Sequence, residues 1–414
     1  MKRRGQNLLL VAGSVALFLG LAEAVLWLVA PPPRLAPIAP GSFAVAPWGL
    51  GLTPGFTGWT DNRIEYRDRV FHVDARGRRV TPAARSIAVP RRRVWVLGDS
   101  QTFGQGLADA ETWPNVLQRR LLAAGPADVR VENLGVPAIN VDQYHSRLKA
   151  TLPATRPGDL VLVGLSWNDL VTDQARDVVV QLAGGHLVTG AAGAAVPATQ
   201  TAPSWRLRLF EATGVAIPRF LDVGQFVLDL SRNSALGSLL APRLRTLYYR
   251  VRADSNAFAP LFAAGVARRN FQLLADMKRR AAGAGLGFAV VFLPNRLFFD
   301  DDLYAAYSQD GRAFPARNYL AHAALPLCRD FAIRCIDTFD ALHARWRDRP
   351  AWPVDGHYAP LGARLVGETA AAAVLPLLAG PGVAPHRGTP SKQRFDGNPA
   401  VPPPQGGRGP AAPR

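Results

Sequence analysis

Cysteine is nearly absent from this chain of 414 residues, which contains only Cys328 and Cys335. There is no Cys-x-x-Cys motif and no cluster of cysteine with histidine, so the sequence does not support a zinc site. Outside the cytoplasm the two thiols could form a disulfide that joins the end of a helix to the strand after it. Two separate buried thiols fit the sequence equally well, and both alternatives stay open.

Lysine is also scarce: it occurs only at positions 2, 149, 278 and 392, so arginine carries almost all of the net charge of +17. A bias toward alanine, arginine and proline runs through the chain, and GC-rich coding is its simplest explanation. Attraction to anionic lipid or acidic glycan is the second interpretation. The arginines form no recognisable nucleic-acid-binding module, so the sequence predicts no nucleic-acid partner.

Charged residues are missing from a long segment near the N-terminus. Three basic residues lie within the first six positions, and residues 8–30 are then apolar apart from Ser14 and Glu23. At ~1.5 Å per residue this run can cross a hydrocarbon layer of ~30 Å. Basic residues ahead of the span keep the N-terminus cytoplasmic. The sequence therefore predicts a single-pass anchor at residues 1–30, with the rest of the chain outside the cytoplasm.

A cleaved signal peptide is the alternative interpretation of this segment. Residues 22–24 form a small-x-small site of the kind that signal peptidases cut. The apolar run continues through residues 25–28, however, which a cleaved signal would not need. We therefore favour the uncleaved anchor.

Composition changes along the chain predict its domains. Residues 31–90 begin with a proline-rich spacer and continue as an irregular, partly β lead-in. From residue 91 to 379 short apolar runs alternate with helical patterns, which is typical of a parallel sheet with crossover helices. Residues 170–260, too long for a plain loop, predict an inserted helical cap. The basic tail, 380–414, is rich in proline and glycine and is predicted to be disordered.

The expected strands are Val94–Leu97, Val129–Asn133, Leu160–Leu165, Phe288–Leu293 and Ile333–Ile336. The expected helices are Trp113–Ala124, Val141–Leu152, Pro260–Ala282 and Leu361–Leu378.

Polar residues follow the ends of the predicted strands. Ser100 comes after the first, Gly135 after the second and Asn168 after the third, while Asp355 and His357 precede the last helix. In an open parallel sheet, ligands bind outside the carboxyl ends of the strands. We therefore expect these residues to converge at one edge.

Together these residues meet the needs of acyl transfer. The hydroxyl of Ser100 needs a base, which the imidazole of His357 can supply, and Asp355 would orient that imidazole. The developing oxyanion needs fixed donors. The backbone N–H groups of Ser100 and Gly135 and the side-chain amide of Asn168 are the candidates.

The order of these residues resembles the SGNH, or GDSL-like, hydrolase family over roughly residues 91–379. The four matching blocks are Gly98-Asp99-Ser100-Gln101-Thr102, Asn133-Leu134-Gly135, Asn168-Asp169 and Asp355-Gly356-His357. The resemblance implies an α/β, flavodoxin-like three-layer sandwich with a central parallel sheet, a Ser-His-Asp triad, and no metal or cofactor. It also implies hydrolysis or transfer of small acyl groups on carbohydrate or lipid substrates. The anchor and lead-in resemble the membrane-tethered bacterial branch, which implies an inner-membrane protein with a periplasmic catalytic domain.

Two positions depart from the family pattern. Ser166 stands where the third block usually has glycine, which could alter the oxyanion pocket. Asp355 lies two residues before His357 rather than three, as in family members that resemble polysaccharide O-acetylation proteins. If Asp355 does not reach the imidazole, Ser100 and His357 could work as a dyad.

Structural roles compete with catalytic ones at two of the motif residues. We assign Asp99 to bonding the backbone amides of its turn, and Asn168 could serve only as a helix cap. Three functions stay open: a hydrolase of acyl esters, a polysaccharide O-acetyltransferase with the same triad, and a non-catalytic glycan-binding envelope protein on the same fold. The sequence does not give the acyl length, the acceptor or the oligomeric state.

Overall fold

The computed structural model describes residues 2–29, 37–63, 65–124, 128–171, 179–183, 186–190, 236, 264–307, 318–353 and 355–379. The predicted tail, 380–414, lies outside these residues. Helix α1 spans Lys2–Val29, and by length and composition its segment Leu10–Val29 could cross a membrane. The C-terminal helix α14 (Pro360–Ala379) passes the same test, but 44% of its apolar window is buried inside the protein.

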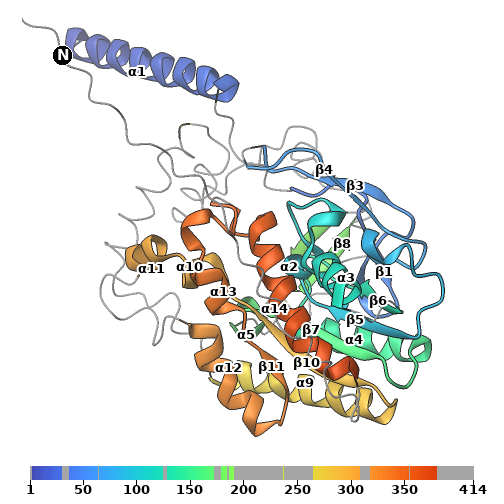
Figure 1. Cartoon of the computed structure of the whole chain (residues 1–414). Coiled ribbons are helices and arrows are strands. Elements are labelled where there is room, and N and C mark those ends of the chain that lie inside the picture. The colour runs from blue at the N-terminus through green and yellow to red at the C-terminus, as the bar shows by residue number, and fades with distance from the viewer. Residues whose placement is uncertain are drawn as a thin grey trace, which may run out of the picture. The chain divides into compact units, whose positions relative to one another are not determined.

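A five-stranded parallel sheet forms the centre of the fold (Figure 1). Its strands are β5 (Arg92–Leu97), β6 (Val129–Asn133), β7 (Leu160–Ser166), β10 (Gly287–Leu293) and β11 (Cys335–Ile336). They lie in the order β6-β5-β7-β10-β11, which is the flavodoxin-like order 2-1-3-4-5. Each of the five predicted strands is present in this sheet. The predicted fold class is therefore confirmed.

Helices cover both faces of the sheet. The longer ones are α3 (Trp113–Ala124), α4 (Val141–Thr151), α9 (Ala264–Gly283), α12 (Tyr319–Asp330) and α14. The short ones are α2 (Ser100–Phe103), α5 (Asn168–Val171), α10 (Arg296–Phe299), α11 (Asp301–Tyr307) and α13 (Phe339–His343). Single 3-10 turns occur at Pro82–Ala84, Asp109–Glu111, Leu152–Ala154 and Trp346–Asp348.

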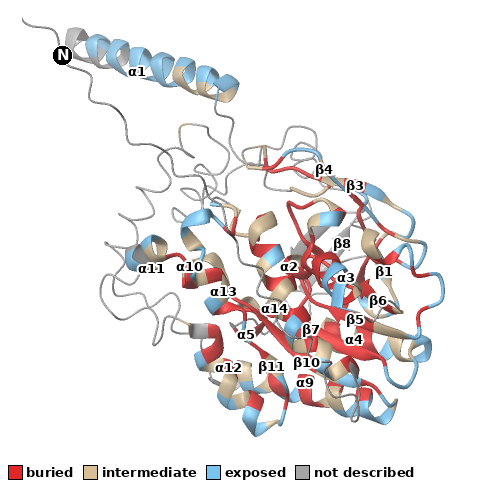
Figure 2. Ribbon diagram, viewed as in Figure 1, coloured by how far each residue is buried: buried red, intermediate tan, exposed pale blue. Residues whose placement is uncertain are grey.

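Alternating side chains on the strands build two cores, one on each face. On β5, Trp95 and Leu97 belong to one buried cluster, whereas Val94 and Val96 belong to the other. Residues of α4, α9 and α12 complete the first cluster, and residues of α3, α13 and α14 complete the second. Figure 2 shows the buried residues concentrated on the sheet and on the helix faces that meet it. This arrangement is the predicted three-layer sandwich.

The lead-in to the sheet contains two antiparallel hairpins. One pairs β1 (Phe43–Ala46) with β2 (Gly49–Leu52), and the other pairs β3 (Thr57–Thr60) with β4 (Arg69–His72). Phe43, Leu52 and Phe71 from these hairpins are buried in the first core cluster. The lead-in therefore contributes to the same core as the sheet.

A third hairpin lies within the predicted helical cap. Strands β8 (Val179–Ala183) and β9 (His186–Gly190) pair antiparallel there. This part of the cap was predicted to be helical, and that prediction is wrong. The physical reason is visible in the sequence, where a Gly-Gly pair separates two short runs with β-branched residues, a strong hairpin signal. Apart from residues 170, 171 and 236, the rest of the predicted cap lies outside the described residues.

One side chain occupies the outer edge of β6. The amide of Gln118 on α3 donates to the carbonyl oxygen of Val129 (2.9 Å) and accepts from the N–H of Val131 (2.6 Å). Gln118 is completely buried. It therefore takes the place of a neighbouring strand over two residues of this edge.

Cys328 and Cys335 form a disulfide. It links the last turns of α12 to β11, as expected for the paired alternative, and it rules out two separate thiols in this structure. Cys328 is buried in the first core cluster.

Candidate active site

The predicted nucleophile lies at the junction of strand β5 and helix α2. Ser100 is the first residue of α2, and the preceding Asp99 caps this helix by accepting a hydrogen bond from the N–H of Gln101 (2.9 Å). The structural role predicted for Asp99 is thus confirmed. Because Ser100 is in the first turn, its own N–H has no acceptor within the helix. It is available to a ligand at the carboxyl end of the sheet.

Glycines let α2 lie directly on the end of the sheet. A Cβ atom on Gly135 would come within 2.3 Å of the backbone nitrogen of Phe103, and one on Gly98 would come within 2.0 Å of Oγ1 of Thr102. Both distances are shorter than any real contact, so a side chain at either position would displace α2. The glycines of the first two motif blocks therefore fix where Ser100 stands.

The three predicted triad residues form one chain of hydrogen bonds. Nε2 of His357 lies 2.8 Å from Oγ of Ser100. Nδ1 of His357 contacts Oδ1 of Asp355, whose side chain is 9% exposed. Ser100 and His357 are separated by 257 positions in sequence; Ser100 follows strand β5, and His357 precedes helix α14. The dyad alternative is not needed, since Asp355 reaches the imidazole despite its short spacing.

The surroundings of His357 and Asp355 favour their charged forms. Burial of His357 acts to lower its pKa, but the charge of Asp355 and the hydrogen bond with it outweigh burial, so the pKa of His357 is raised. Burial of Asp355 acts to raise its pKa, but His357 and the hydroxyl of Tyr66 outweigh that effect and lower the pKa. A negatively charged Asp355 beside His357 stabilises the imidazolium that forms when His357 accepts a proton during acyl transfer.

The predicted oxyanion donors differ in their availability. The N–H of Gly135 donates to Oδ1 of Asn133 (2.9 Å), and the amide of Asn133 in turn donates to the carbonyl oxygen of Thr102 (3.1 Å). An acyl oxygen would thus have to share the N–H of Gly135 with Asn133. The side chain of Asn168 hydrogen-bonds to Asp99, next to the nucleophile. Asn168 thus contacts the residue before the nucleophile, and its role as an oxyanion donor stays a prediction.

Two buried carboxyl groups support this end of the sheet. Asp169 of the third block accepts from the N–H of Ser166 (2.8 Å) and from the hydroxyl of Tyr144 (3.1 Å), and it is completely buried. Burial and the nearby charge of Asp99 raise the pKa of Asp169 well above its usual range. Burial likewise raises the pKa of Asp99. Ser166 thus ends β7 on a structural hydrogen bond.

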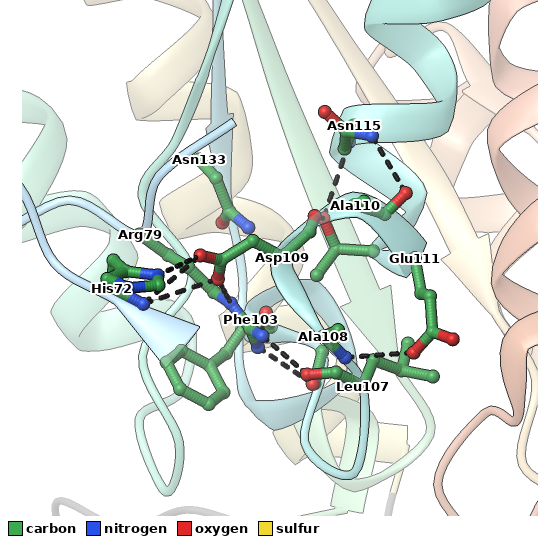
Figure 3. A network of polar contacts seen from close by, with 12 residues as sticks. His72, Arg79, Phe103, Leu107, Ala108, Asp109, Ala110, Glu111, Asn115 and Asn133 are labelled. Carbon is green, nitrogen blue, oxygen red and sulfur yellow. Dashed lines mark hydrogen bonds and ion pairs between the residues drawn. The ribbon is translucent and has the colours of Figure 1, made fainter. Parts of the chain in front are cut away.

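Arg79, from the lead-in, holds the loop that follows α2. It is 1% exposed. Its guanidinium donates to the carbonyl oxygens of Phe103 (2.7 Å), Gly104 (2.8 Å) and Leu107 (2.6 Å) and to Oδ1 of Asp109 (3.0 Å), as Figure 3 shows. These contacts fix both ends of the loop.

The network around Arg79 also places a polar side chain in the site. His72 contacts the second oxygen of Asp109 through Nδ1 at 2.7 Å, so Asp109 is bonded from two sides (Figure 3). The loop that Arg79 holds contains Gln105, whose Nε2 lies 3.3 Å from Oδ2 of Asp355. The lead-in therefore acts on the triad through this loop.

Several residues of the site were not predicted from the sequence. Tyr66 donates its hydroxyl to Oδ2 of Asp355 (2.7 Å), and Glu65 accepts the backbone N–H of Asp355 (2.8 Å). The sequence does contain a local signal, because Asn62 and Glu65 have the spacing of a capping box. That signal predicts a turn but says nothing about residue 355, which lies 289 positions from Tyr66.

Among the described residues, no group of three or more histidine, cysteine, aspartate or glutamate side chains could hold a metal ion.

No family model matches the chain, and no curated protein matches it either. Solved structures do. A carbohydrate acetylesterase family member from Sinorhizobium meliloti is 16% identical, with 70% of this chain and 99% of that chain covered and a TM-score of 0.37. A member of the lipolytic G-D-S-L family from Veillonella parvula is 13% identical, with 67% and 96% covered and a TM-score of 0.33. A lipase/acylhydrolase from Enterococcus faecalis is 12% identical, with 68% and 95% covered and a TM-score of 0.33.

The second of these structures bears the name of the family that the four sequence blocks resemble. These TM-scores are low, so the fold class rests on the strand order of the sheet.

Proposed function

We propose that this chain is an extracytoplasmic serine esterase or acyl hydrolase that cleaves acyl groups, acetyl first among them, from carbohydrate or lipid. The observation that carries the proposal is the hydrogen-bonded chain from Ser100 through His357 to Asp355. A serine hydroxyl, an imidazole and a carboxylate in this order are the parts of an activated nucleophile. The four sequence blocks that resemble SGNH hydrolases support the same chemistry.

The reaction follows from the positions of these groups. Oγ of Ser100 attacks the acyl carbon while Nε2 of His357 takes the hydroxyl proton, and Asp355 stabilises the imidazolium that forms. The imidazolium then returns the proton to the leaving alcohol, which departs and leaves an ester on Ser100. Water, deprotonated by the same imidazole, attacks this ester and releases the acid, and Oγ recovers its proton.

Stabilisation of the oxyanion falls to donors near Ser100. Its own N–H at the start of α2 and the amide of Asn168 are our candidates, with the N–H of Gly135 shared with Asn133. Fixed donors of this kind each lower the barrier by roughly 3–4 kcal/mol.

A sugar hydroxyl in place of water would make the protein an O-acetyltransferase. One feature favours keeping this second candidate, namely the spacing of two residues between Asp355 and His357, which resembles polysaccharide O-acetylation proteins. The triad steps are the same until the acyl group leaves Ser100. Only the acceptor differs.

The location is also part of the proposal. Helix α1 would anchor the chain in a bacterial inner membrane, with the N-terminus in the cytoplasm and the catalytic domain in the periplasm. The disulfide between Cys328 and Cys335 supports a site outside the cytoplasm, because disulfides persist in oxidising compartments.

Covalent labelling tests the nucleophile. We expect a fluorophosphonate to label the detergent-solubilised full chain, Ser100→Ala to lose the label, and Ser146→Ala to keep it. Ser146 is a suitable control because its hydroxyl bonds the carbonyl oxygen of Asp142 within α4. Gel fluorescence and intact mass would measure the label. Equal labelling of the Ser100→Ala and native chains would remove Ser100 from the mechanism, and a folded native chain without label would favour a non-catalytic glycan-binding protein.

The acceptor can be identified with an aryl acetate. Free acetate, released in the absence of glycan and undiminished by added glycan, would establish the hydrolase. Acetylated sugar at the expense of free acetate would establish the transferase. Mass spectrometry of the glycan and an acetate assay distinguish these outcomes.

A further inference from the structure

A turn in the lead-in contacts the acid of the proposed triad directly. We define the clamp turn as Asn62, Glu65 and Tyr66, which lie between strands β3 and β4. Tyr66 donates its hydroxyl to Oδ2 of Asp355 at 2.7 Å, and Glu65 accepts the backbone N–H of Asp355 at 2.8 Å. The clamp turn thus holds Asp355 by both its side chain and its backbone.

The clamp turn is braced from within. Oδ1 of Asn62 accepts the backbone N–H groups of Glu65 (2.8 Å) and Tyr66 (3.2 Å), and Nδ2 of Asn62 donates to Oε2 of Glu65 (3.1 Å). Asn62 is 2% exposed. A buried amide that satisfies three partners holds a turn in one conformation. The two groups that reach Asp355 therefore start from fixed positions.

Packing holds the tyrosine as well. The ring of Tyr66 lies 5.6 Å, centroid to centroid, from the ring of Trp352, and Tyr66 is 2% exposed. Burial, and then the charge of Asp355, raise the pKa of the Tyr66 hydroxyl far above its usual range. The hydroxyl therefore stays protonated and remains a donor wherever the protein is folded.

Within the loop that carries Asp355, the backbone N–H of His357 donates to Oδ1 of Asp355 at 3.2 Å. The next residue, Gly356, has a φ of +86°, and no atom lies within 4 Å of the place where its Cβ would be. A glycine in open space imposes little restraint on its neighbours. Further restraint on Asp355 comes from outside the loop, where the clamp turn and Gln105 contact its carboxylate or its N–H.

We propose that the clamp turn is a positioning device for the active site: Tyr66 and Glu65 hold the Asp355 carboxylate beside Nδ1 of His357, and the Tyr66 hydroxyl takes up part of its negative charge, which sets the proton affinity of the imidazole. This inference rests on the proposed function. It gives the membrane-proximal lead-in a part in catalysis, since two of the residues that complete the site come from the hairpin region between the anchor and the sheet. It also explains how a carboxylate only two positions from its histidine is kept in place.

Tyr66→Phe is the direct test, because it removes the hydroxyl and keeps the ring against Trp352. Without its neutral donor, Asp355 keeps more negative charge facing the imidazole, so the pKa of His357 rises. The other ionisable group facing the imidazole, Asp99, is unchanged. We expect the fluorophosphonate labelling rate at its pH optimum to fall about tenfold and its acid limb to move to higher pH. A rate within about twofold of the native chain with an unmoved acid limb would overturn the proposal.

A second measurement separates this inference from the proposed function. The titration of His357 can be followed by NMR, with His357→Gln to assign its signal among the seven histidines. We expect the midpoint of His357 to rise in Tyr66→Phe whether or not the native chain reacts with the probe. Absence of labelling in the native chain would therefore defeat the esterase, whereas an unchanged midpoint would defeat the clamp.

Variants at Glu65 extend the test should Tyr66→Phe fail to fold. Gln at position 65 keeps an oxygen that can accept the N–H of Asp355, and Ala does not. We expect Glu65→Ala to lower the labelling rate several-fold and Glu65→Gln to restore most of it. Thr53→Val is the matched control, because it removes another lead-in hydrogen bond, to the carbonyl oxygen of Gly41, that does not touch the triad. Equal rates for Glu65→Ala and Glu65→Gln would contradict the positioning role.

Discussion

At the scale of single residues, the proposed base must be neutral to accept a proton from Ser100, while its neighbours favour the charged form. Asp355 raises the pKa of His357 above the ordinary value of 6.5, against the effect of burial. The neutral imidazole therefore predominates only above a pH that is itself higher than 6.5. The same interaction stabilises the imidazolium that forms during the reaction. Asp355 therefore lowers the barrier of the reaction, but it also reduces the fraction of neutral, reactive His357 at low pH.

This balance predicts a pH profile. The labelling rate of the native chain should fall as the pH drops through the raised pKa of His357, with its midpoint above 6.5. In Asp355→Asn the charge is gone and burial is left to lower the pKa, so the acid limb should move to lower pH. The maximal rate should drop by about 10³–10⁴-fold, because the imidazolium loses its partner. Labelling across pH 5–9 would measure both effects, and an acid limb that stays in place would contradict the assignment of His357.

The reacting residues could be predicted from the sequence, whereas most of the residues that hold them in place could not. Ser100 stands in a short motif directly after a clear strand, and Asp355 and His357 stand in one directly before a clear helix, so their convergence could be predicted. Tyr66 and Arg79 act across long separations, and nothing in their neighbourhoods marks their partners. The bond between Gly135 and Asn133 is local, yet the sequence does not show that it competes with an oxyanion.

At the scale of elements, the buried cation Arg79 joins the lead-in to the loop after α2. Its guanidinium donates hydrogen bonds to three carbonyl oxygens and one carboxylate, which would otherwise be bonded to water (Figure 3). It also lies over the ring of Phe103, 4.4 Å from its centroid. A planar group with several donors suits this task, and lysine could not reproduce it.

Loss of the Arg79 guanidinium should lower the stability of the folded chain. Arg79→Met leaves the carboxylate of Asp109 buried without its guanidinium partner, and we expect the free energy of unfolding to fall by about 3–5 kcal/mol. The partly exposed ion pair of Arg69 with Glu111 (3.6 Å) provides the control, because Arg69→Met should cost no more than about 1 kcal/mol. Thermal or urea unfolding would compare the two variants. Equal losses would show that burial of Arg79 does not carry the effect.

The elements themselves were predictable to different degrees. Strand β6 has the predicted bounds because its apolar pattern stands between clear helical segments. The four lead-in strands have only four residues each and are interrupted by glycine and proline, so their share in the core was not foreseen. The hairpin of β8 and β9 was missed because a helical cap was inferred from segment length rather than from its Gly-Gly pair.

At the scale of the whole molecule, one covalent bond closes the C-terminal part of the sheet. The disulfide joins α12 to β11, and β11 contributes only two residues to the sheet. A strand of two residues forms few hydrogen bonds with its neighbour and is stabilised little by them. The disulfide stabilises this region because it restricts the unfolded chain. The predicted limits of the catalytic domain, 91–379, and of the anchor, 1–30, remain predictions at this scale.

Removal of the disulfide should lower stability without touching the triad. For a loop of seven or eight residues, closure is worth about 2–3 kcal/mol, so Cys328→Ala with Cys335→Ala should lower the unfolding free energy by that amount. Labelling of the folded variant should stay close to that of the native chain. Native protein treated with a reductant should show the same loss of stability. A count of two free thiols on the untreated exported chain would contradict the bond.

The buried amide of Gln118 has a consequence for how this protein meets other copies of itself. The outermost strand of a sheet ordinarily offers unpaired N–H and C=O groups that can recruit a foreign strand and start aggregation. Along β6 the groups of Val129 and Val131 are already bonded to Gln118. A second chain could extend the sheet there only after pulling a fully enclosed amide out of the interior, so this border is protected against edge-to-edge polymerisation.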